Sequence, residues 1–358
     1  MGVKNIVLAF DGTWNTPDDE DTDRDQDDST NVWKFYEAVS PSTPQGIEQI
    51  KWYEKGVGTN WYTKITGGVF GAGLSNRIQD GYQWLAENFA EGDQIYLVGF
   101  SRGAYTARSL VGMIRNAGLL LPDESDRTKD AYDLYRDDEG PDSPEALTFR
   151  ESYSREIRVR FLGVWDTVGS LGIPVESFDW FNKAYYQFHD TKLGRVVENA
   201  FHAVAIDEHR KNYTCTLWDP VEEPSQRLEQ VWFAGAHANV GGGYADNQLS
   251  DIPLLWMLDR AVQCGLAVDP DQVPDVPADL LAPLVDSYSR FLKGAYRKLE
   301  PPFLRQIGGT RFGREEIHPS VTNRSQLDAE YRPGNPIGEH LRGEAWNSPA
   351  TGQDAAPG

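Results

Sequence analysis

One serine of the sequence stands in a setting that suits a nucleophile. Gly99-Phe-Ser-Arg-Gly103 matches the pattern Gly-x-Ser-x-Gly, and it directly follows the apolar segment Gln94–Val98. In such a strand-to-helix turn the hydroxyl is exposed, the glycines leave room for the neighbouring elements, and the helix dipole stabilises negative charge. We expect Ser101 to be the nucleophile, and a purely structural turn is the alternative.

A serine nucleophile needs a general base. Among the six histidines, only His237 both follows a predicted strand and opens a glycine-rich loop, Gly235–Gly243. Glycines beside an imidazole let backbone and substrate approach it closely. His237 is therefore the expected base, with His318 as the weaker candidate. His202 is expected on an apolar helical face, as a core residue.

The base in turn needs a carboxylate that orients it. When the serine lies on a strand-to-helix turn, the chain order is Ser, then Asp or Glu, then His, each beyond the end of a strand. Asp166 directly follows the predicted strand Arg158–Trp165, so it is the expected acid. Asp207 is the competing candidate.

Hydrolysis by a serine also needs two donors for the oxyanion. The backbone N–H of Arg102, directly after the nucleophile, is the first expected donor. The segment Phe10-Asp-Gly-Thr-Trp-Asn15 follows a predicted strand and can supply the second from Gly12 or Thr13, with Asp11 supporting the loop.

An acidic block after the first strand suggests a calcium site, but its spacing is wrong. Asp23, Asp25 and Asp27 alternate as in an EF-hand loop, yet Asp28 stands where that loop needs Gly, and Lys34 where it needs Glu. A solvated acidic loop is the better interpretation. No metal and no cofactor are expected.

Two further motifs are incomplete. In the glycine stretch Gly71-x-Gly73, Asn76 occupies the place of the third glycine of a dinucleotide fingerprint, and a flexible loop is favoured. Phe10-Asp-Gly-Thr13 resembles half of the nucleophile loop of haloacid-dehalogenase-type phosphatases. Ala9 stands in place of the first Asp of that loop, which argues against phosphatase chemistry.

The elements that must position these residues alternate along the chain. Apolar runs ended by Gly or Asp predict buried parallel strands, and apolar residues at helical spacing predict the helices between them. This alternation predicts an α/β fold with a mainly parallel central sheet flanked by helices and interrupted by inserted loop or helical segments. The predicted strands are Ile6–Phe10, Lys51–Tyr53, Gln94–Val98, Arg158–Trp165 and Val231–Ala234; the predicted helices are Asn31–Val39, Leu74–Leu85, Ala104–Ile114 and Ile252–Val262; Glu198–Ile206 is expected to be a helix or a helix-to-strand passage.

The length suits one large domain with insertions. Of 358 residues, 1–320 are expected to form a single α/β domain with insertions at about 120–155, 174–197 and 265–305. The aromatic-rich segment 178–188 is a candidate lid or acyl-binding wall, and core packing explains it equally well. Residues 321–358 are polar and are expected to form a largely irregular tail.

Composition excludes several classes of function. The chain has 34 Lys and Arg against 55 Asp and Glu, a net charge of −21, and two cysteines. This charge argues against nucleic-acid binding, and two cysteines exclude a disulfide framework. No apolar run reaches the ~20 residues of a membrane helix, and the N-terminal run is too short for a signal peptide. We expect a cytoplasmic protein, or one secreted without a cleavable signal.

Five motifs, taken together, resemble the DUF2235 family of α/β-hydrolases, which includes the catalytic domain of Tle1-type phospholipase effectors of type VI secretion. The similarity runs from about residue 4 to about residue 320. The motifs are Phe10-Asp-Gly-Thr-Trp-Asn15, Gly99-Phe-Ser-Arg-Gly-Ala104, Gly163-Val-Trp-Asp-Thr-Val-Gly169, Ala205-Ile-Asp-Glu-His-Arg210 and Trp232-Phe-Ala-Gly-Ala-His-Ala-Asn-Val-Gly-Gly-Gly-Tyr244.

By position, the resemblance implies Ser101, Asp166 and His237 as a catalytic triad. It implies cleavage of carboxylic esters through an acyl-enzyme, on a small-molecule or lipid ester as in esterases, lipases or phospholipase A, and a possible secretion-system or immunity partner. The chain is shorter than the larger effectors with a membrane-engaging domain, and its acidity disfavours anionic membranes, so a simple esterase is the favoured form. The alternative is a non-catalytic lipid-binding or secretion-associated protein on the same fold.

Overall fold

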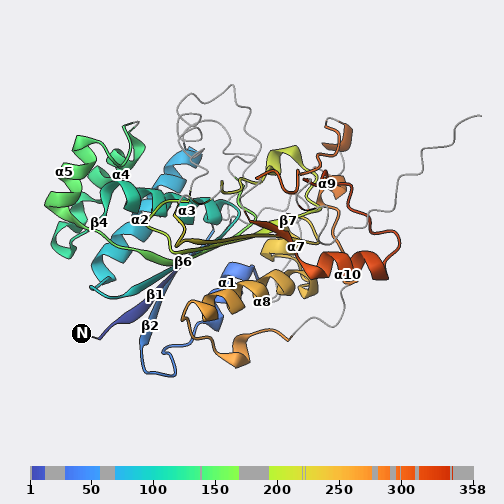
Figure 1. Ribbon diagram of the computed structural model, residues 1–358, viewed down its shortest axis with the longest axis horizontal. Coiled ribbons are helices and arrows are strands. Elements are labelled where there is room, and N and C mark those ends of the chain that lie inside the picture. The colour runs from blue at the N-terminus through green and yellow to red at the C-terminus, as the bar shows by residue number, and fades with distance from the viewer. Residues whose placement is uncertain are drawn as a thin grey trace, which may run out of the picture.

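Strands that run in one direction form the central sheet of the molecule (Figure 1). The computed structural model describes residues 2–12, 29–56, 69–137, 139–168, 193–219, 221, 223–275, 281–290, 296–298, 300–310, 314–338 and 341. Within these residues seven strands pair in the order β2-β1-β3-β6-β7-β8-β9, and every pairing is parallel. They are β1 (Lys4–Phe10), β2 (Glu48–Glu54), β3 (Gln94–Phe100), β6 (Val159–Trp165), β7 (Asn199–Ala205), β8 (Arg227–Phe233) and β9 (Glu315–Ile317).

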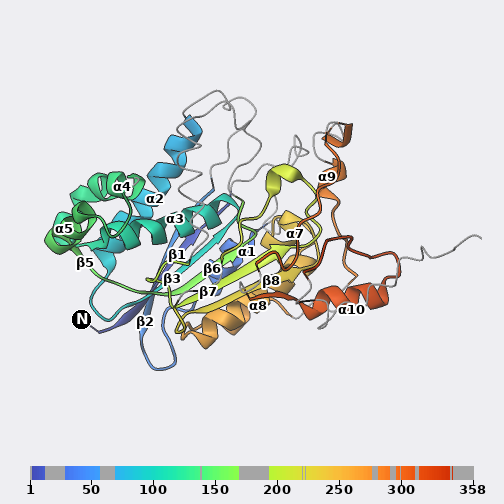
Figure 2. The same cartoon turned by 45° about the horizontal axis from the view of Figure 1, so that its top comes forward.

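Helices cover both faces of this sheet, as Figures 1 and 2 show. On one face α2 (Val69–Asn88) and α3 (Arg102–Ala117) bury Tyr82, Leu85 and Leu110 against alternate residues of β1, β3 and β6. On the other face α1 (Asn31–Ala38) and α8 (Gln248–Gln263) pack Phe35 and Met257 on the intervening strand residues. Because both faces are covered, the inner strands β1, β3, β6 and β7 are almost wholly buried and mostly apolar, which is typical of parallel sheets. The predicted α/β fold with a mainly parallel sheet is confirmed. The flexible loop expected for Gly71-x-Gly73 is wrong, because both glycines lie inside helix α2, where isolated glycines are tolerated at some cost in stability.

The segment around residue 200 is a strand, and not the helix that the sequence left open. β7 is entirely extended and pairs in parallel with β6 and β8. Its burial pattern leaves only Asn199 partly exposed. A strand buried on both faces is continuously apolar and lacks the alternation that distinguishes strand from helix. His202 therefore lies on a core strand rather than on a helix.

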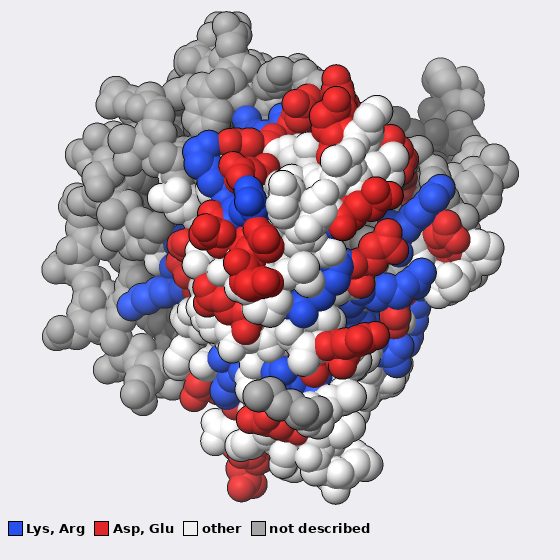
Figure 3. Space-filling model, turned by 90° about the vertical axis from the view of Figure 1, so that its left-hand side faces the viewer, with Lys and Arg blue, Asp and Glu red and all other residues white. Residues whose placement is uncertain are grey.

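A two-stranded antiparallel ribbon joins the two ends of the segment between α3 and β6. β4 (Leu119–Leu120) pairs with β5 (Ser154–Arg155), and between them lie α4 (Thr128–Arg136) and α5 (Pro144–Tyr153). This part occupies the left of Figure 1, and its outer face is drawn in Figure 3, where acidic and basic side chains are interleaved. Arg127 pairs there with Glu124 and Asp130.

The last described part of the chain packs beside β8 and β9. α9 (Ser287–Arg290) precedes it, and α10 (Pro319–Leu327) starts at an N-cap made by His318 and buries Val321. Helix α10 spans the boundary that the sequence analysis placed at residue 320. The division into a domain of residues 1–320 and a tail stays a prediction, and so do its three insertions.

Candidate active site

The carboxyl ends of the parallel strands gather the polar residues singled out above. Gly12 follows β1, Ser101 follows β3, Asp166 follows β6, and His237 begins α7 (His237–Gly241) just beyond β8. Ligands of open parallel sheets bind at this edge, because loops from neighbouring strands meet there.

Ser101 forms the turn between β3 and α3. Its backbone has φ 56° and ψ −118°, its N–H donates to the carbonyl oxygen of Trp165 at 3.1 Å, and its carbonyl oxygen accepts from Tyr105 at 3.2 Å. A positive φ is strained for any residue other than glycine. These neighbours hold Ser101 in that conformation at the N-terminal end of α3, where the helix dipole favours an anion.

Two glycines make this turn sterically feasible. A Cβ atom on Gly99 would lie 2.5 Å from the carbonyl oxygen of Gly103, and one on Gly103 would lie 2.0 Å from the carbonyl oxygen of Phe10. Both obstacles are backbone atoms and cannot rotate away. The glycines of the Gly-x-Ser-x-Gly pattern are thus required by the packing of α3 against β1 and β3.

Gly12 lies directly beside the serine. A Cβ on Gly12 would lie 3.3 Å from the Cβ of Ser101. Its N–H donates to Oδ1 of Asp11 at 2.6 Å, so this structure directs the donor to a carboxylate rather than to an oxyanion. Oδ2 of Asp11 accepts from the hydroxyls of Thr30 and Tyr53, both at 2.6 Å. Burial raises the pKa of Asp11 to about 6, and these hydrogen bonds oppose the rise.

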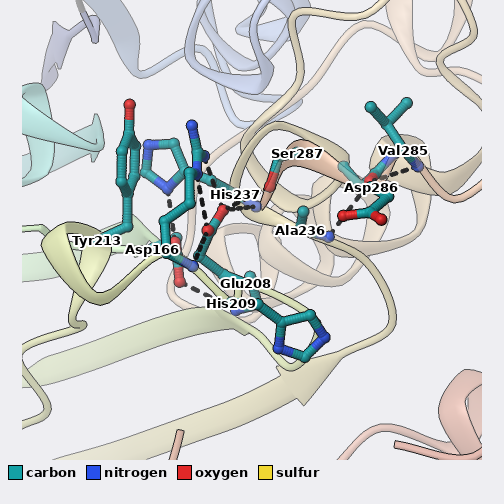
Figure 4. Close-up of polar contacts among 12 residues, drawn as sticks. Asp166, Glu208, His209, Tyr213, Ala236, His237, Val285, Asp286 and Ser287 are labelled. Carbon is teal, nitrogen blue, oxygen red and sulfur yellow. Dashed lines mark hydrogen bonds and ion pairs between the residues drawn. The ribbon is translucent and has the colours of Figure 1, made fainter. Parts of the chain in front are cut away.

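His237 and Asp166 are in direct contact (Figure 4). Nδ1 of His237 lies 2.5 Å from Oδ2 of Asp166. Asp166 has φ 39° and no exposed surface, and its Oδ1 accepts the N–H of Ala205 at 3.0 Å. A carboxylate at Nδ1 places the proton there, which leaves the lone pair of the imidazole on Nε2.

A cation that the sequence analysis did not consider holds the same carboxylate. Nη1 of Arg305 donates to Oδ1 of Asp166 at 2.5 Å, and Nη2 donates to Oδ2 at 3.1 Å. Burial alone would raise the pKa of Asp166, but Arg305 and His237 outweigh burial and hold that pKa below its usual range. Asp166 is therefore ionised at neutral pH.

A second buried ion pair supports the backbone of His237. Glu208 pairs with Arg210 at 2.7 Å, and its Oε2 accepts the backbone N–H of His237 at 3.3 Å and the hydroxyl of Ser287 at 3.1 Å. Burial opposes ionisation of Glu208, but Arg210 outweighs it and lowers the pKa to about 2. Figure 4 shows Glu208 and Ser287 converging on the same loop as His237.

Aromatic rings enclose the imidazole. Phe100 lies 4.6 Å from it, centroid to centroid, and Tyr213 packs edge-on at 5.0 Å. Burial in these surroundings lowers the pKa of His237 below its ordinary value, while Asp166 acts in the opposite direction. A neutral imidazole that keeps its lone pair on Nε2 is suited to accept a proton from a hydroxyl.

The competing candidates make other contacts. The carboxylate of Asp207 accepts from the N–H of Gly235 at 2.7 Å and from the hydroxyl of Tyr331 at 2.9 Å, so it fixes the loop before His237. The imidazole of His318 caps α10 through Ser320. His202 accepts the N–H of Thr167 at 3.1 Å inside the sheet.

Some expectations fall outside the described residues. These are Thr13, the acidic block and the aromatic segment 178–188. Among the described residues, no three His, Cys, Asp or Glu side chains are grouped so as to hold a metal ion. In the same part of the chain, no helix combines the length and the apolarity needed to cross a membrane.

Sequence reasoning missed Glu208 and Arg305. Glu208 lies within the motif Ala205-Ile-Asp-Glu-His-Arg210. That motif could have indicated Glu208, but only its Asp207 was considered as a candidate acid. Arg305 lies 139 positions from Asp166, in Pro302-Phe-Leu-Arg-Gln306. No local pattern there distinguishes it from a surface arginine.

Comparison with known proteins identifies the family to which the chain is similar. A family model described as the catalytic domain of Tle1-like phospholipase effectors of the type VI secretion system matches residues 4–260. An uncharacterized protein of Saccharomyces cerevisiae is 29% identical over 243 residues, which is 61% of this chain and 33% of the yeast protein. The chain thus spans about a third of the length of this relative.

Two solved structures are similar to parts of the chain. The crystal structure of an uncharacterized protein from Pseudomonas aeruginosa has a TM-score of 0.47 and 19% identity, over 77% of this chain and 48% of that one. The structure of the Tle1 effector bound to the VgrG spike of the type VI secretion system has a TM-score of 0.34 and 18% identity, over 68% of this chain and 52% of that one.

Proposed function

This chain belongs to the Tle1-like phospholipase effector family through the catalytic domain of that family, and on this premise we propose that it is a serine hydrolase of carboxylic esters. Ser101 is the nucleophile, His237 the general base and Asp166 the acid that orients it. The observation that carries the proposal is the 2.5 Å contact of His237 Nδ1 with the buried Asp166, on the strand next to the strained Ser101 turn.

The mechanism follows from the contact of Nδ1 with Asp166, which leaves Nε2 as the basic nitrogen. Nε2 of His237 accepts the proton of the Ser101 hydroxyl as Oγ attacks the ester carbonyl, and Asp166 stabilises the imidazolium that forms. The tetrahedral intermediate collapses, the C–O bond to the alcohol breaks, and the alcohol leaves with the proton from Nε2. Water then attacks the acyl-enzyme by the same route, which releases the carboxylic acid and restores Ser101.

The oxyanion is stabilised at the start of α3. The backbone N–H of Arg102 is the first of that helix, where the dipole adds to the hydrogen bond. The second donor comes from the loop after β1. Because Gly12 donates to Asp11 in this structure, Thr13 is the better second donor, and Asp11 supports the loop.

The substrate is a small-molecule or lipid ester. Family membership favours a phospholipase A-type activity on a lipid, delivered by a secretion machine that carries its effectors without a cleavable signal. The net charge of −21 favours zwitterionic or neutral esters, because an acidic surface is repelled by anionic membranes. A secretion-system component and an immunity protein are the proposed partners.

Labelling with a fluorophosphonate probe tests the nucleophile. Wild-type protein should be labelled, and Ser101→Ala should lose the label together with hydrolysis of p-nitrophenyl esters and phospholipid vesicles. Ser109→Ala is the matched control, since Ser109 is a buried serine two turns further along α3 and should leave labelling intact.

The outcomes separate the possible functions. Turnover of short esters with untouched phospholipids would restrict the activity to a simple esterase and remove the phospholipase part of the proposal. Folded wild-type protein without label or turnover would leave the non-catalytic lipid-binding alternative.

A further inference from the structure

The guanidinium of Arg305 is buried beside Asp166 and donates four hydrogen bonds there. Besides its two bonds to Asp166, Nη1 donates to the carbonyl oxygen of Ala205 at 2.8 Å and Nη2 to that of Tyr213 at 2.5 Å. The side chain is 3% exposed, so substrate and solvent reach it poorly. Because four acceptor oxygens surround it, the guanidinium can take only one orientation. Its two parallel N–H donors, the fork of Arg305, then fix the orientation of the Asp166 carboxylate.

The charges around the imidazole form two nearly neutral pairs. Asp166 with Arg305 lies on the Nδ1 side, and Glu208 with Arg210 lies beneath the backbone of His237. Each pair presents a weaker negative potential to the imidazole than a lone carboxylate would. The charged and titratable groups around His237 are Asp166 after β6 and Glu208, Arg210 and Tyr213 in the segment after β7. Ser287 of α9 donates to Glu208, and Arg305 of the segment 300–310 donates to Asp166.

We propose that Arg305 is a positioning residue, which acts on His237 through Asp166 without touching the substrate. It fixes the carboxylate so that Oδ2 receives Nδ1–H, and it takes up part of the carboxylate charge, which keeps the imidazole a weaker base. This proposal rests on the proposed roles of Ser101, Asp166 and His237. Because the family match ends at residue 260, the later part of the chain completes the site.

Two substitutions separate orientation from charge. Arg305→Met removes both the fork and the positive charge, and it should raise the imidazole pKa of His237 by about one unit and lower kcat by at least about 10-fold. Arg305→Lys keeps the charge without the fork, so it should lower kcat by about 10-fold and leave the imidazole pKa close to wild type. The pKa is measured by NMR titration of the imidazole nitrogens, with His237→Gln assigning the signal.

Arg324→Met is the matched control. Arg324 is a buried arginine of the same part of the chain, and its Nη1 donates to the carbonyl oxygen of Ala282 at 2.9 Å. Its replacement should lower thermal stability without moving the imidazole pKa. A pKa in Arg305→Met equal to that of wild type, or moved equally by Arg324→Met, would overturn the proposal.

Separate controls distinguish a loss of folding from a loss of function. Circular dichroism checks the fold of each variant; if Arg305→Met does not fold, Arg305→Lys decides, and an unchanged kcat in that variant overturns the proposal. If wild-type protein cleaves no ester, the proposed function fails, while the NMR titration of Arg305→Met still tests the coupling between Arg305 and His237.

Discussion

At the scale of single residues, Ser101 and Asp166 share a strained backbone. Both have positive φ, 56° and 39°, although neither is a glycine. Such conformations cost about 1–3 kcal/mol each and persist only where the surroundings impose them. Here hydrogen bonds from Ser101 to Trp165 and from Asp166 to Ala203 link both turns to neighbouring strands. Both turns lie at the edge of the sheet at which His237 begins α7.

Replacing Ser101 should expose this strain. Ser101→Ala and Ser101→Gly should both be inactive, but Ser101→Gly should be the more stable of the two by about 1 kcal/mol, since glycine adopts positive φ without a steric penalty. Urea denaturation of both variants measures the difference. Equal stabilities would show that the turn is not strained in solution.

The depressed pKa of His237 should shape the pH profile. Only the neutral imidazole accepts the serine proton, so kcat/KM falls as pH drops through the pKa of His237. Because burial lowers that pKa below 6.5, activity should persist below pH 6.5, and the midpoint of the acid limb should lie under that value. A pH-stat assay measures this limb. A midpoint above 6.5 would contradict the direction of the shift.

At the scale of elements, close approach of backbones positions the nucleophile. α3 crosses the ends of β1 and β3 so tightly that Gly99 and Gly103 have no space for a side chain. The end of β3 is thereby fixed against β1, and Gly12 comes to lie beside Ser101. The position of the nucleophile is thus a consequence of helix–sheet packing rather than of the loop alone.

The same substitution at two glycines should have opposite effects. Gly99→Ala places a Cβ 2.5 Å from backbone and should destabilise the protein by more than about 3 kcal/mol or prevent folding. Gly73→Ala, within helix α2 with nothing inside 4 Å of the added atom, should stabilise by about 0.5–1 kcal/mol. Thermal unfolding compares the two variants, and a folded, fully active Gly99→Ala would refute the packing argument.

At the scale of the whole molecule, buried ionisable groups outnumber those that the proposed reaction uses. Burial lowers the pKa of His202 to about 3 and raises the pKa of Asp207 above its ordinary value. A histidine with a lowered folded-state pKa stabilises the fold above pH 6.5 and loses that contribution as pH falls. A carboxyl with a raised pKa acts with the opposite sign, since its contribution is lost as pH rises. Both contributions enter the acid stability of the molecule, together with those of the other buried groups whose pKa values are shifted, Asp11, Asp166, Glu208 and His237.

Substitution of His202 isolates its contribution to the pH dependence of stability. His202→Gln keeps an acceptor for the N–H of Thr167 but cannot take up a proton. Between pH 6 and pH 4 the variant should lose about 1.4 kcal/mol less stability per pH unit than wild type. Urea denaturation at a series of pH values gives both slopes. Parallel slopes would mean that His202 is not held neutral by burial.

The sequence alone determined the α/β fold and the residues from which the site was predicted. Apolar runs, helical spacing and the glycines around Ser101 are local patterns, and each strand end in this fold faces the same edge, so the order of Ser101, Asp166 and His237 predicts their convergence. For the apolar strand β7 the local pattern failed, because burial on both faces removes the alternation that marks a strand.

Only the tertiary structure decided how the carboxylates are held. Arg305 reaches Asp166 across 139 positions, and Ser287 reaches Glu208 across 79. It also decided that the N–H of Gly12 donates to Asp11. A lone arginine in a loop or a serine at the start of a short helix carries no periodic signal, and its partner is set by the path of the folded chain. Contacts of this kind depend on distances in space, which local spacing in the sequence does not encode.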